Sequence, residues 1–386
     1  MITAPAAGIY VHIPFCRSKC RYCDFYSLPD REHQIGRFVA SLVTEIREAV
    51  DEVKGWKFDT VYIGGGTPNL LTPEQLGAVM QALKDTFGLE GLEECTMEAN
   101  PGEASEAQLR GYREAGVNRI SFGFQSFDPK LLQFLGRIHT PEDNFTSFEM
   151  ARRAGFDNIS CDLLFNIPGQ SLKRWKADLA ALVALGPEHI STYSLTMEQG
   201  TPLSEEVARG AIRMPEEETD LAMYTWAREY LAGQGYDMYE IGNHAREGRA
   251  CRHNLHYWRI GPYLGFGPAA HRFDGEVRSW NVRDLDEYLK RVEGGESPVA
   301  GEERLTPVQL QNEKLAFGLR LREGLSVTEE MGYESVEAFV EVYGAKLEQL
   351  HDSVVLNADR LSLTEKGVLL ADSVTAELFL DEEGEL

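Results

Sequence analysis

The stretch GIYVHIPFCRSKCRYCDFYS, residues 8–27, places a short apolar run directly before three closely spaced cysteines. The run is rich in β-branched residues and has the length of a buried strand. Cys16, Cys20 and Cys23 follow it with the spacing C-x3-C-x2-C. We therefore expect a strand that delivers a loop of thiols to one edge of a sheet.

The strand predicted at residues 8–13 is the first of a series. Similar runs, separated by segments of helical period such as 35–46 and 76–83, occur at 60–65, 94–99, 119–124, 158–165 and 189–195. Strands that alternate with helices predict a parallel sheet with right-handed crossovers. The pattern fits a doubly wound open sheet or an incomplete (β/α)6 barrel. In both architectures ligands bind at the C-terminal ends of the strands.

The strand rhythm weakens after about residue 205. The sequence HNLHYWRIGPYLGFGPAAH at 253–271 is rich in glycine and aromatic residues and predicts an irregular packed segment. Thr306 followed by Pro307 predicts the start of a helix, and residues 360–374 predict a strand, a turn and a helix. A small winged-helix-like module is expected there. We expect three parts: residues 1–205, 206–304 and 305–386.

The chain of 386 residues is strongly acidic, with a formal net charge of -24. Such a charge repels nucleic acid and anionic lipid, so neither is an expected partner. No stretch approaches the roughly 18 apolar residues that span a bilayer, and the apolar start lacks the basic residues of a secretory signal. We expect a cytoplasmic protein.

The six cysteines are too sparse and too unevenly placed for a secreted disulfide framework. The clustered three predict a metal site instead. Three thiolates on a [4Fe–4S] cluster leave one iron free to bind a small molecule, as catalytic zinc sites keep one position open. The alternatives are a zinc site, with His12 as a nearby ligand, or reactive thiols. Cys95 and Cys161 fall within predicted strands and are expected in the core.

The triplet, with the aromatic Tyr22 and Phe25 beside its third cysteine, resembles the signature of the radical S-adenosylmethionine superfamily. The resemblance implies an α/β fold, a partial (β/α)6 barrel of the TIM type. It also implies a [4Fe–4S] cluster on the three cysteines, with the amino and carboxylate groups of S-adenosylmethionine on the fourth iron. In that superfamily the cluster reduces the sulfonium to give a 5′-deoxyadenosyl radical, while the protein supplies position and electrostatics.

The same resemblance implies a set of contacts to S-adenosylmethionine. The turn GGGTP at 64–68 follows the second strand, where glycines let the backbone approach a ligand. Taken singly, such a turn or a lone polar residue is more often structural. Taken in order, the motifs match the superfamily's contacts at Tyr10, Tyr22, Gly65, Gly66, Thr67, Glu98, Gln125, Arg137 and Asp162. No catalytic residue is assigned.

The order of these motifs resembles the branch that contains oxygen-independent coproporphyrinogen III oxidases and a family of heme chaperones. The oxidases decarboxylate a porphyrinogen, whereas the chaperones bind heme and deliver it to an acceptor protein. Phe25 stands where the oxidases carry a further cysteine, and only residues 1–15 precede Cys16, whereas the oxidases have a long N-terminal extension. HNLHYW at 253–258 resembles the chaperone motif H-N-x-x-Y-W. We expect a heme chaperone, with the oxidase as the alternative and another radical enzyme as a third reading.

The motif makes His253 the candidate heme ligand, because neutral imidazole is a common axial donor to iron. Tyr257 and Trp258 would add flat apolar area, and His256 is a second candidate. The alternative is a packed core turn whose imidazole is hydrogen-bonded. Expected partners are heme and an acceptor protein, with membrane-bound acceptors reached only through another protein. The chain is expected to be a monomer or homodimer.

Overall fold

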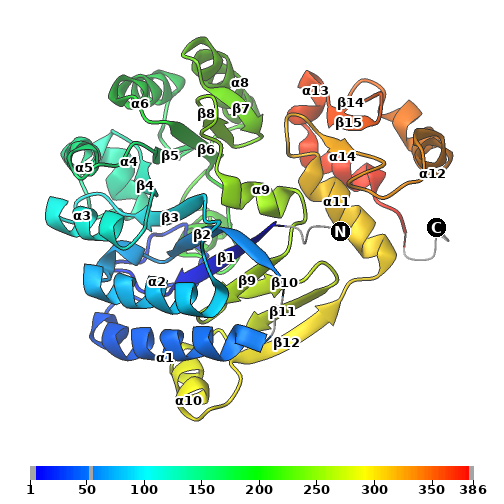
Figure 1. Cartoon of the computed structure of the whole chain (residues 1–386). Coiled ribbons are helices and arrows are strands. Elements are labelled where there is room, and N and C mark those ends of the chain that lie inside the picture. The colour runs from blue at the N-terminus through cyan, green and yellow to red at the C-terminus, as the bar shows by residue number, and fades with distance from the viewer. Residues whose placement is uncertain (1–5, 52–54, 382–386) are drawn as a thin grey trace.

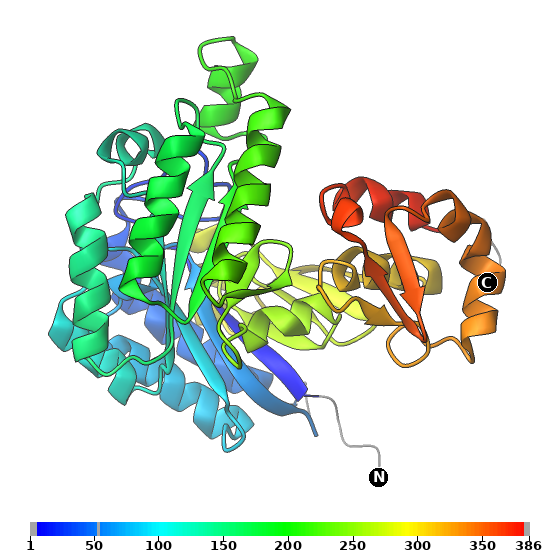
Figure 2. The same ribbon diagram turned by 90° about the horizontal axis from the view of Figure 1, so that it is seen from above.

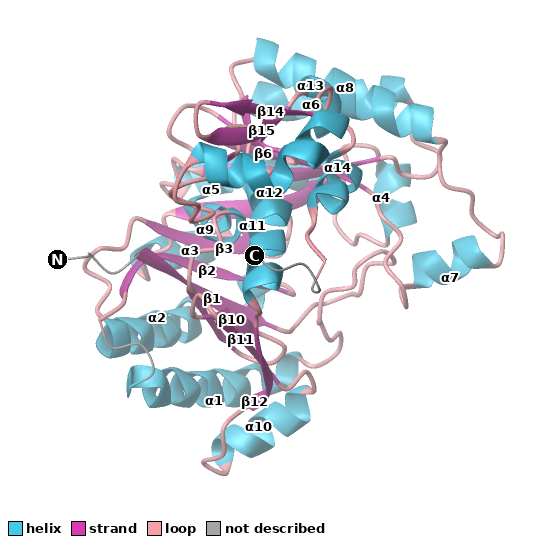
Figure 3. Ribbon diagram, turned by 90° about the vertical axis from the view of Figure 1, so that its right-hand side faces the viewer, coloured by secondary structure: helices cyan, strands magenta, loops and turns pink. Residues whose placement is uncertain are grey.

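The computed structural model describes residues 6–51 and 55–381, and its main feature is a twelve-stranded sheet. The six predicted strands are parallel neighbours in chain order (Figure 1): β1 (Ala6–Ile13), β2 (Lys57–Gly65), β3 (Glu94–Ala99), β4 (Arg119–Gln125), β5 (Ile159–Phe165) and β6 (His189–Ser194). Figure 3 shows these strands stacked side by side through the molecule, with helices outside them. The predicted α/β class is confirmed.

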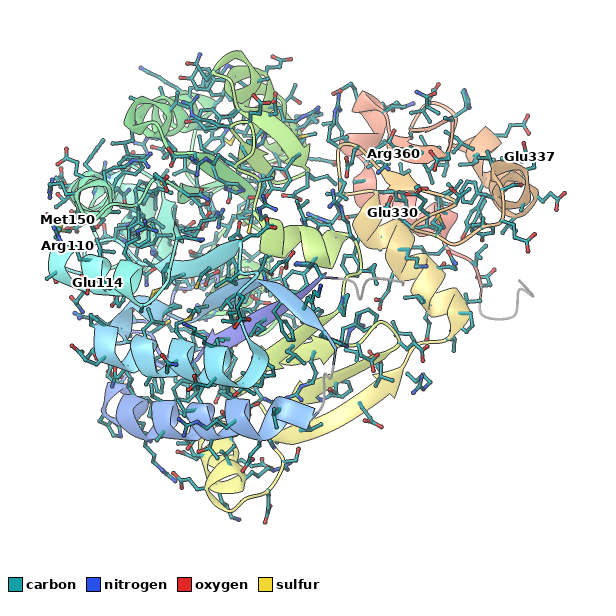
Figure 4. The ribbon with its side chains drawn as sticks, viewed as in Figure 1. Arg110, Glu114, Met150, Glu330, Glu337 and Arg360 are labelled. Carbon is teal, nitrogen blue, oxygen red and sulfur yellow. The ribbon has the colours of Figure 1, made fainter. Side chains whose placement is uncertain are left out.

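Within the described ranges, six helices cover the strands, and five of them begin with a side-chain cap. They are α1 (Ile35–Glu48), α2 (Pro73–Phe87), α3 (Glu106–Glu114), α4 (Pro129–Leu135), α5 (Pro141–Arg153) and α6 (Leu172–Leu185), with short 3-10 turns at Glu32–Gln34, Ala49–Asp51 and Pro68–Leu70. Thr72, Ser105 and Thr140 each form a capping box that satisfies free backbone N–H groups of the first turn. The polar outer face of α3 carries Arg110 and Glu114, and these side chains lie at the edge of the molecule in Figure 4.

The sheet extends at both edges beyond the predicted strands. One edge gains β9 (Tyr263–Phe266), parallel to β1, and then the antiparallel β10 (His271–Phe273), β11 (Val277–Asn281) and β12 (Val299–Arg304). The other edge gains β8 (Asn243–Ala245) and β7 (Asp237–Glu240), preceded by α7 (Pro202–Ala208) and α8 (Glu217–Gly233).

The prediction of an irregular segment at 253–271 was wrong. The chain there forms α9 (Arg252–Trp258), then β9 and the start of β10. The glycines that suggested irregularity serve close packing, because a Cβ on Gly265 would collide with the backbone carbonyl of His271. The segment is therefore regular and part of the large sheet.

The C-terminal residues form a separate, smaller layer that lies to one side of the sheet (Figure 2). It holds α11 (Pro307–Gly318), α12 (Val336–Gln349), α13 (Glu365–Val368), α14 (Ala371–Leu378) and a sheet of β13 (Leu325–Ser326), β15 (Arg360–Leu363) and β14 (Val354–Asn357); α10 (Leu285–Glu293) precedes it on the large sheet. Thr306 caps α11 as predicted, and residues 360–374 form the predicted strand, turn and helix. Arg360 pairs with Glu330 inside this module (Figure 4).

The C-terminal module has its own apolar core and is tied to the β7–β8 edge of the sheet. Ile241 N donates to Arg320 O at 3.1 Å, and Arg322 N donates to Tyr239 O at 2.9 Å. Arg228 on α8 pairs with Glu365 at 2.5 Å. These contacts hold the module beside the barrel rim, while the three-part division at residues 205 and 305 stays a prediction.

None of the helices in the described ranges is long and apolar enough to cross a membrane.

Candidate functional site

A cavity of about 320 Å³ opens at the C-terminal ends of the parallel strands and reaches into the barrel. It gathers nearly all the residues that the sequence predicted at a cofactor site. The predicted residues that line it are Cys16, Cys20, Tyr22, Cys23, Gly65, Gly66, Thr67, Glu98, Gln125, Arg137 and Asp162. Tyr10 and His253 do not line it.

The three cysteines lie on the loop after β1, and their thiols are free and partly exposed. Thr67 Oγ1 donates to Cys16 Sγ at 3.2 Å, and Arg137 Nη1 donates to Cys20 Sγ at 3.6 Å. Burial raises the pKa of the Cys23 thiol to about 11. A cation that binds these sulfurs replaces their protons, and donors to sulfur stabilise the thiolates that result.

No three His, Cys, Asp or Glu side chains in the described ranges converge on a single-ion site. Thiolates that bind three different irons of a cubane need no common point. The donor set fits a cluster that is bound through three corners.

The glycine turn after β2 packs against the base of the cysteine loop. Gly66 N donates to Ile13 O at 2.8 Å, and a Cβ on Gly66 would lie 2.5 Å from Phe15 O. Gly65 adopts φ 105°, and a Cβ there would lie 2.5 Å from the His12 ring. Only glycine allows this approach, so the turn and the cysteine loop form one rigid wall of the cavity.

Two buried carboxyl groups face the cavity from β3 and β5. Glu98 accepts hydrogen bonds from Tyr62 OH at 2.8 Å and from Gly65 N at 3.1 Å. Burial, and then the charge of Asp162, raise the pKa of Glu98 to about 7. Burial also raises the pKa of Asp162. Both carboxylates would be stabilised by a cationic ligand, and an ammonium or sulfonium group has that charge.

Arg137 joins the cysteine loop to the strand ends. Its Nη2 donates to Asn100 Oδ1 at 2.6 Å and to Gly123 O at 2.8 Å. Asn100 Nδ2 in turn donates to Thr67 Oγ1 at 2.9 Å. Asn100 therefore completes a chain of contacts from the Cys16 thiol to the Cys20 thiol. The sequence prediction missed Asn100, although it stands two residues after Glu98 in MEANP.

Other missed residues line the barrel interior below these groups. They alternate with buried apolar neighbours along the strands, and this period of two was the signal that could have found them. They are Tyr62, Arg119, Ser121, Ser160, His189, Ser191 and Tyr193.

Tyr10 lies beneath the glycine turn. Its hydroxyl group is 3.0 Å from His12 Nδ1, and His12 Nε2 is 2.8 Å from Tyr26 O. Tyr10 thus supports the ring on which Gly65 packs. Its predicted direct contact to the cofactor stays a prediction.

His253 is fully buried on α9, and both of its ring nitrogens have protein partners. Nδ1 lies 3.0 Å from Thr60 Oγ1, and Nε2 lies 3.0 Å from Tyr257 OH. The ring stacks on Tyr62 with centroids 5.2 Å apart. In this conformation the imidazole has no free lone pair to offer an iron outside the core, so heme ligation by His253 stays a prediction. Its neighbour Asn254 is the motif residue that lines the cavity.

The other residues of this region are also engaged. His256 Nε2 lies 2.7 Å from Asp59 Oδ1, and the Trp258 ring lies beneath the guanidinium of Arg320. Cys251 Sγ donates to Glu94 Oε1 at 3.4 Å. The segment 251–258 is therefore a packed support beneath the cavity.

Comparisons with known proteins agree with this geometry. Residues 10–182 match the family model of the Radical SAM superfamily. The chain is 35% identical over 378 residues to the heme chaperone HemW of Bacillus subtilis (strain 168), which covers 98% of this chain and 96% of that protein. It is 32% identical over 392 residues to the mitochondrial radical S-adenosyl methionine domain-containing protein 1 of Danio rerio, covering 98% of this chain and 88% of that one.

Among solved structures, coproporphyrinogen III oxidase (HemN) from Escherichia coli superposes with a TM-score of 0.83 at 21% identity. The match covers 98% of this chain and 91% of that chain. At this identity the likeness establishes the fold, and it extends over the C-terminal module as well as the barrel.

Proposed function

The chain belongs to the radical SAM superfamily and, within it, to the HemW family, and from this premise we propose that it is a heme chaperone, which binds heme and transfers it to an acceptor protein. The observation that carries the proposal is the 35% identity to a heme chaperone over 98% of the chain. The similarity therefore includes the C-terminal module and is not limited to the cofactor-binding barrel.

As a radical SAM protein the chain holds a [4Fe–4S] cluster and binds S-adenosylmethionine. We assign the cluster to Cys16, Cys20 and Cys23, whose loop is fixed against Gly66. When bound, the cluster supplies the electron that can cleave the sulfonium of S-adenosylmethionine.

The chain's own residues hold and orient the cofactor. Glu98 is placed by Tyr62 and Gly65 to accept from an ammonium group, which would lower the pKa of this carboxyl from about 7. Thr67 and Arg137 donate to the sulfurs of Cys16 and Cys20 and so stabilise their thiolate forms.

The side chain at position 25 supports a chaperone rather than an oxidase. Phe25 is 63% exposed and stands beside the cavity where the oxidases carry a further cysteine. An exposed phenyl group provides apolar contact area but no thiol chemistry. The superposition on the oxidase HemN shows that the two proteins share a fold. It does not bear on the difference in side chain at position 25.

The test is a heme titration of the anaerobically reconstituted protein, followed by mixing with the apo form of a heme protein. We expect saturable heme binding and transfer of the heme to the acceptor. The same sample is incubated with coproporphyrinogen III, S-adenosylmethionine and a reductant, and protoporphyrinogen is assayed. Multiple turnovers of decarboxylation would overturn the chaperone proposal in favour of the oxidase.

A further inference from the structure

A second cavity, of about 860 Å³, lies beside the cofactor cavity. Its walls come from the cysteine loop, from β6 and the residues after it, from α8, and from α13 and its C-terminal flank in the C-terminal module. The two cavities share Tyr22, Cys23, Phe25, Leu164 and Tyr193. Its volume lies within the range of about 300–1,000 Å³ that is typical of cofactor and small-molecule sites.

Exposed apolar side chains gather around this second cavity. Phe25, Leu221 and Leu370 are 63%, 45% and 47% exposed, and Tyr193 and Leu369 on the same walls are also exposed. Large apolar side chains that are left in water around one concave site mark a ligand surface, since their burial is favourable and no segment of the described residues covers them. The ligand must be large and mostly apolar.

The charged residues of the cavity are divided between its walls. The barrel rim and α8 contribute Asp24, Glu198, Glu217 and Asp220, whereas the C-terminal side contributes Arg320 and Lys366. Arg320 lies 3.7 Å from the buried Glu240, and its Nε has no hydrogen-bond partner. Lys366 Nζ is also paired, with Asp352 Oδ2 at 3.1 Å. An anionic group would therefore be repelled from the α8 side, and on the C-terminal side it would share Arg320 and Lys366 with these two carboxylates.

We propose that this cavity is the heme site: the porphyrin packs on Phe25, Tyr193 and Leu221, and its two propionates face Arg320 and Lys366. The inference rests on the proposed function and adds the place on the protein where heme binds. Heme is a flat apolar molecule with two carboxylates at one edge, which matches an apolar cavity with two cations on one wall. No histidine is among the described residues that line the cavity, so this site works without His253.

The proposed heme site shares one wall with the cofactor cavity. Tyr22, Cys23 and Phe25 belong to the cysteine loop, so the cluster-bound loop forms one wall of the heme site. The proposed heme site and the cofactor cavity therefore meet along this loop.

The experiment compares matched variants by heme titration of the reconstituted protein. Leu221→Gln replaces an exposed apolar residue of a helix at the cavity, and Val340→Gln makes a comparable change on α12, where Val340 is 41% exposed outside the cavity lining. We expect Leu221→Gln to raise the dissociation constant about tenfold, as loss of apolar burial predicts, and Val340→Gln to leave it unchanged.

The charge of the propionates is tested with a second pair. Lys366→Gln should weaken heme binding about fivefold, whereas Lys84→Gln on the distant α2 should not. Heme dimethyl ester, in which both propionates are capped, should bind the wild type and Lys366→Gln equally. Iron content and circular dichroism verify that each variant folds.

The outcomes separate the two proposals. If the wild type binds heme and both cavity variants match their controls, the heme site lies elsewhere and the location is refuted while the chaperone function stands. If the wild type binds no heme, the proposed function itself fails.

Discussion

Replacing Gly66 with alanine should disrupt the cluster site without touching a predicted iron ligand. The added Cβ would lie 2.5 Å from Phe15 O and 2.8 Å from Ile13 O, and both neighbours are backbone atoms that cannot rotate away. The same two carbonyls accept hydrogen bonds from Thr67 N and Gly66 N. The turn must therefore move away from the cysteine loop.

The cost follows from these contacts. Overpacking typically destabilises by about 1–3 kcal/mol, and each lost backbone hydrogen bond costs about 1 kcal/mol. We expect Gly66→Ala to lower the free energy of unfolding by about 2–4 kcal/mol and to remove the donor from Thr67 to Cys16 Sγ. Most of the bound iron should be lost.

Gly77 provides the control. It lies within α2, and no atom approaches within 4 Å of a Cβ built there. Gly77→Ala should stabilise the protein by about 0.5–1 kcal/mol, because alanine favours the helix, and should keep full iron content. Urea unfolding and iron analysis after reconstitution measure both effects. Full iron content and an unchanged unfolding midpoint in Gly66→Ala would refute the packing argument.

Three further predictions test individual groups. Cys20→Ser should abolish the broad absorbance of the reconstituted cluster; retained stoichiometric iron and sulfide would disprove the ligand assignment. Because the pKa of Glu98 is raised from its ordinary 4.5 to about 7, the stability that it contributes is complete below about pH 4.5 and is lost as the pH rises through 7. Relative to the wild type, the free energy of unfolding of Glu98→Gln should therefore rise by up to about 3 kcal/mol across that pH window. If urea unfolding gives the same difference between the two proteins at pH 4.5 and at pH 7.5, this prediction is contradicted. His253→Ala should cost about 2–4 kcal/mol of stability, because it empties a buried stacked position and leaves Thr60 and Tyr257 without their partner. In a heme titration of this variant at unchanged iron content, a higher dissociation constant would support the predicted ligation by His253, and an unchanged one would place the heme ligand elsewhere.

The barrel and most of the cofactor site could be predicted because their signals are local. Each of the six parallel strands has six or more residues, enough to show an apolar run, and the cysteines, the glycine turn, Glu98 and Gln125 lie at or just after strand ends. Asn100 and His189 were missed because a single polar residue has no pattern of its own until the strand register shows which way it points.

The remaining strands could not be predicted for the opposite reason. β8 and β10 have three residues each and β9 has four, too few to show a period of two. Gly265 further resembled a loop residue, although it serves the close approach of His271. These strands form because the edges of a preformed sheet offer backbone partners.

The sequence by itself determined the cysteine loop, the alternation of strands and helices and the family, because spacing and period are written along the chain, whereas the order of the strands in the sheet came from the structure. Only the tertiary structure decided which side chains face the ligand. It buried His253 between Tyr257 on the same helix and Thr60 on the remote strand β2, so that both ring nitrogens have protein partners. It also brought Arg320 and Lys366 opposite Phe25, forming a cavity between barrel and C-terminal module, because packing between remote segments depends on three-dimensional contacts that no local pattern encodes.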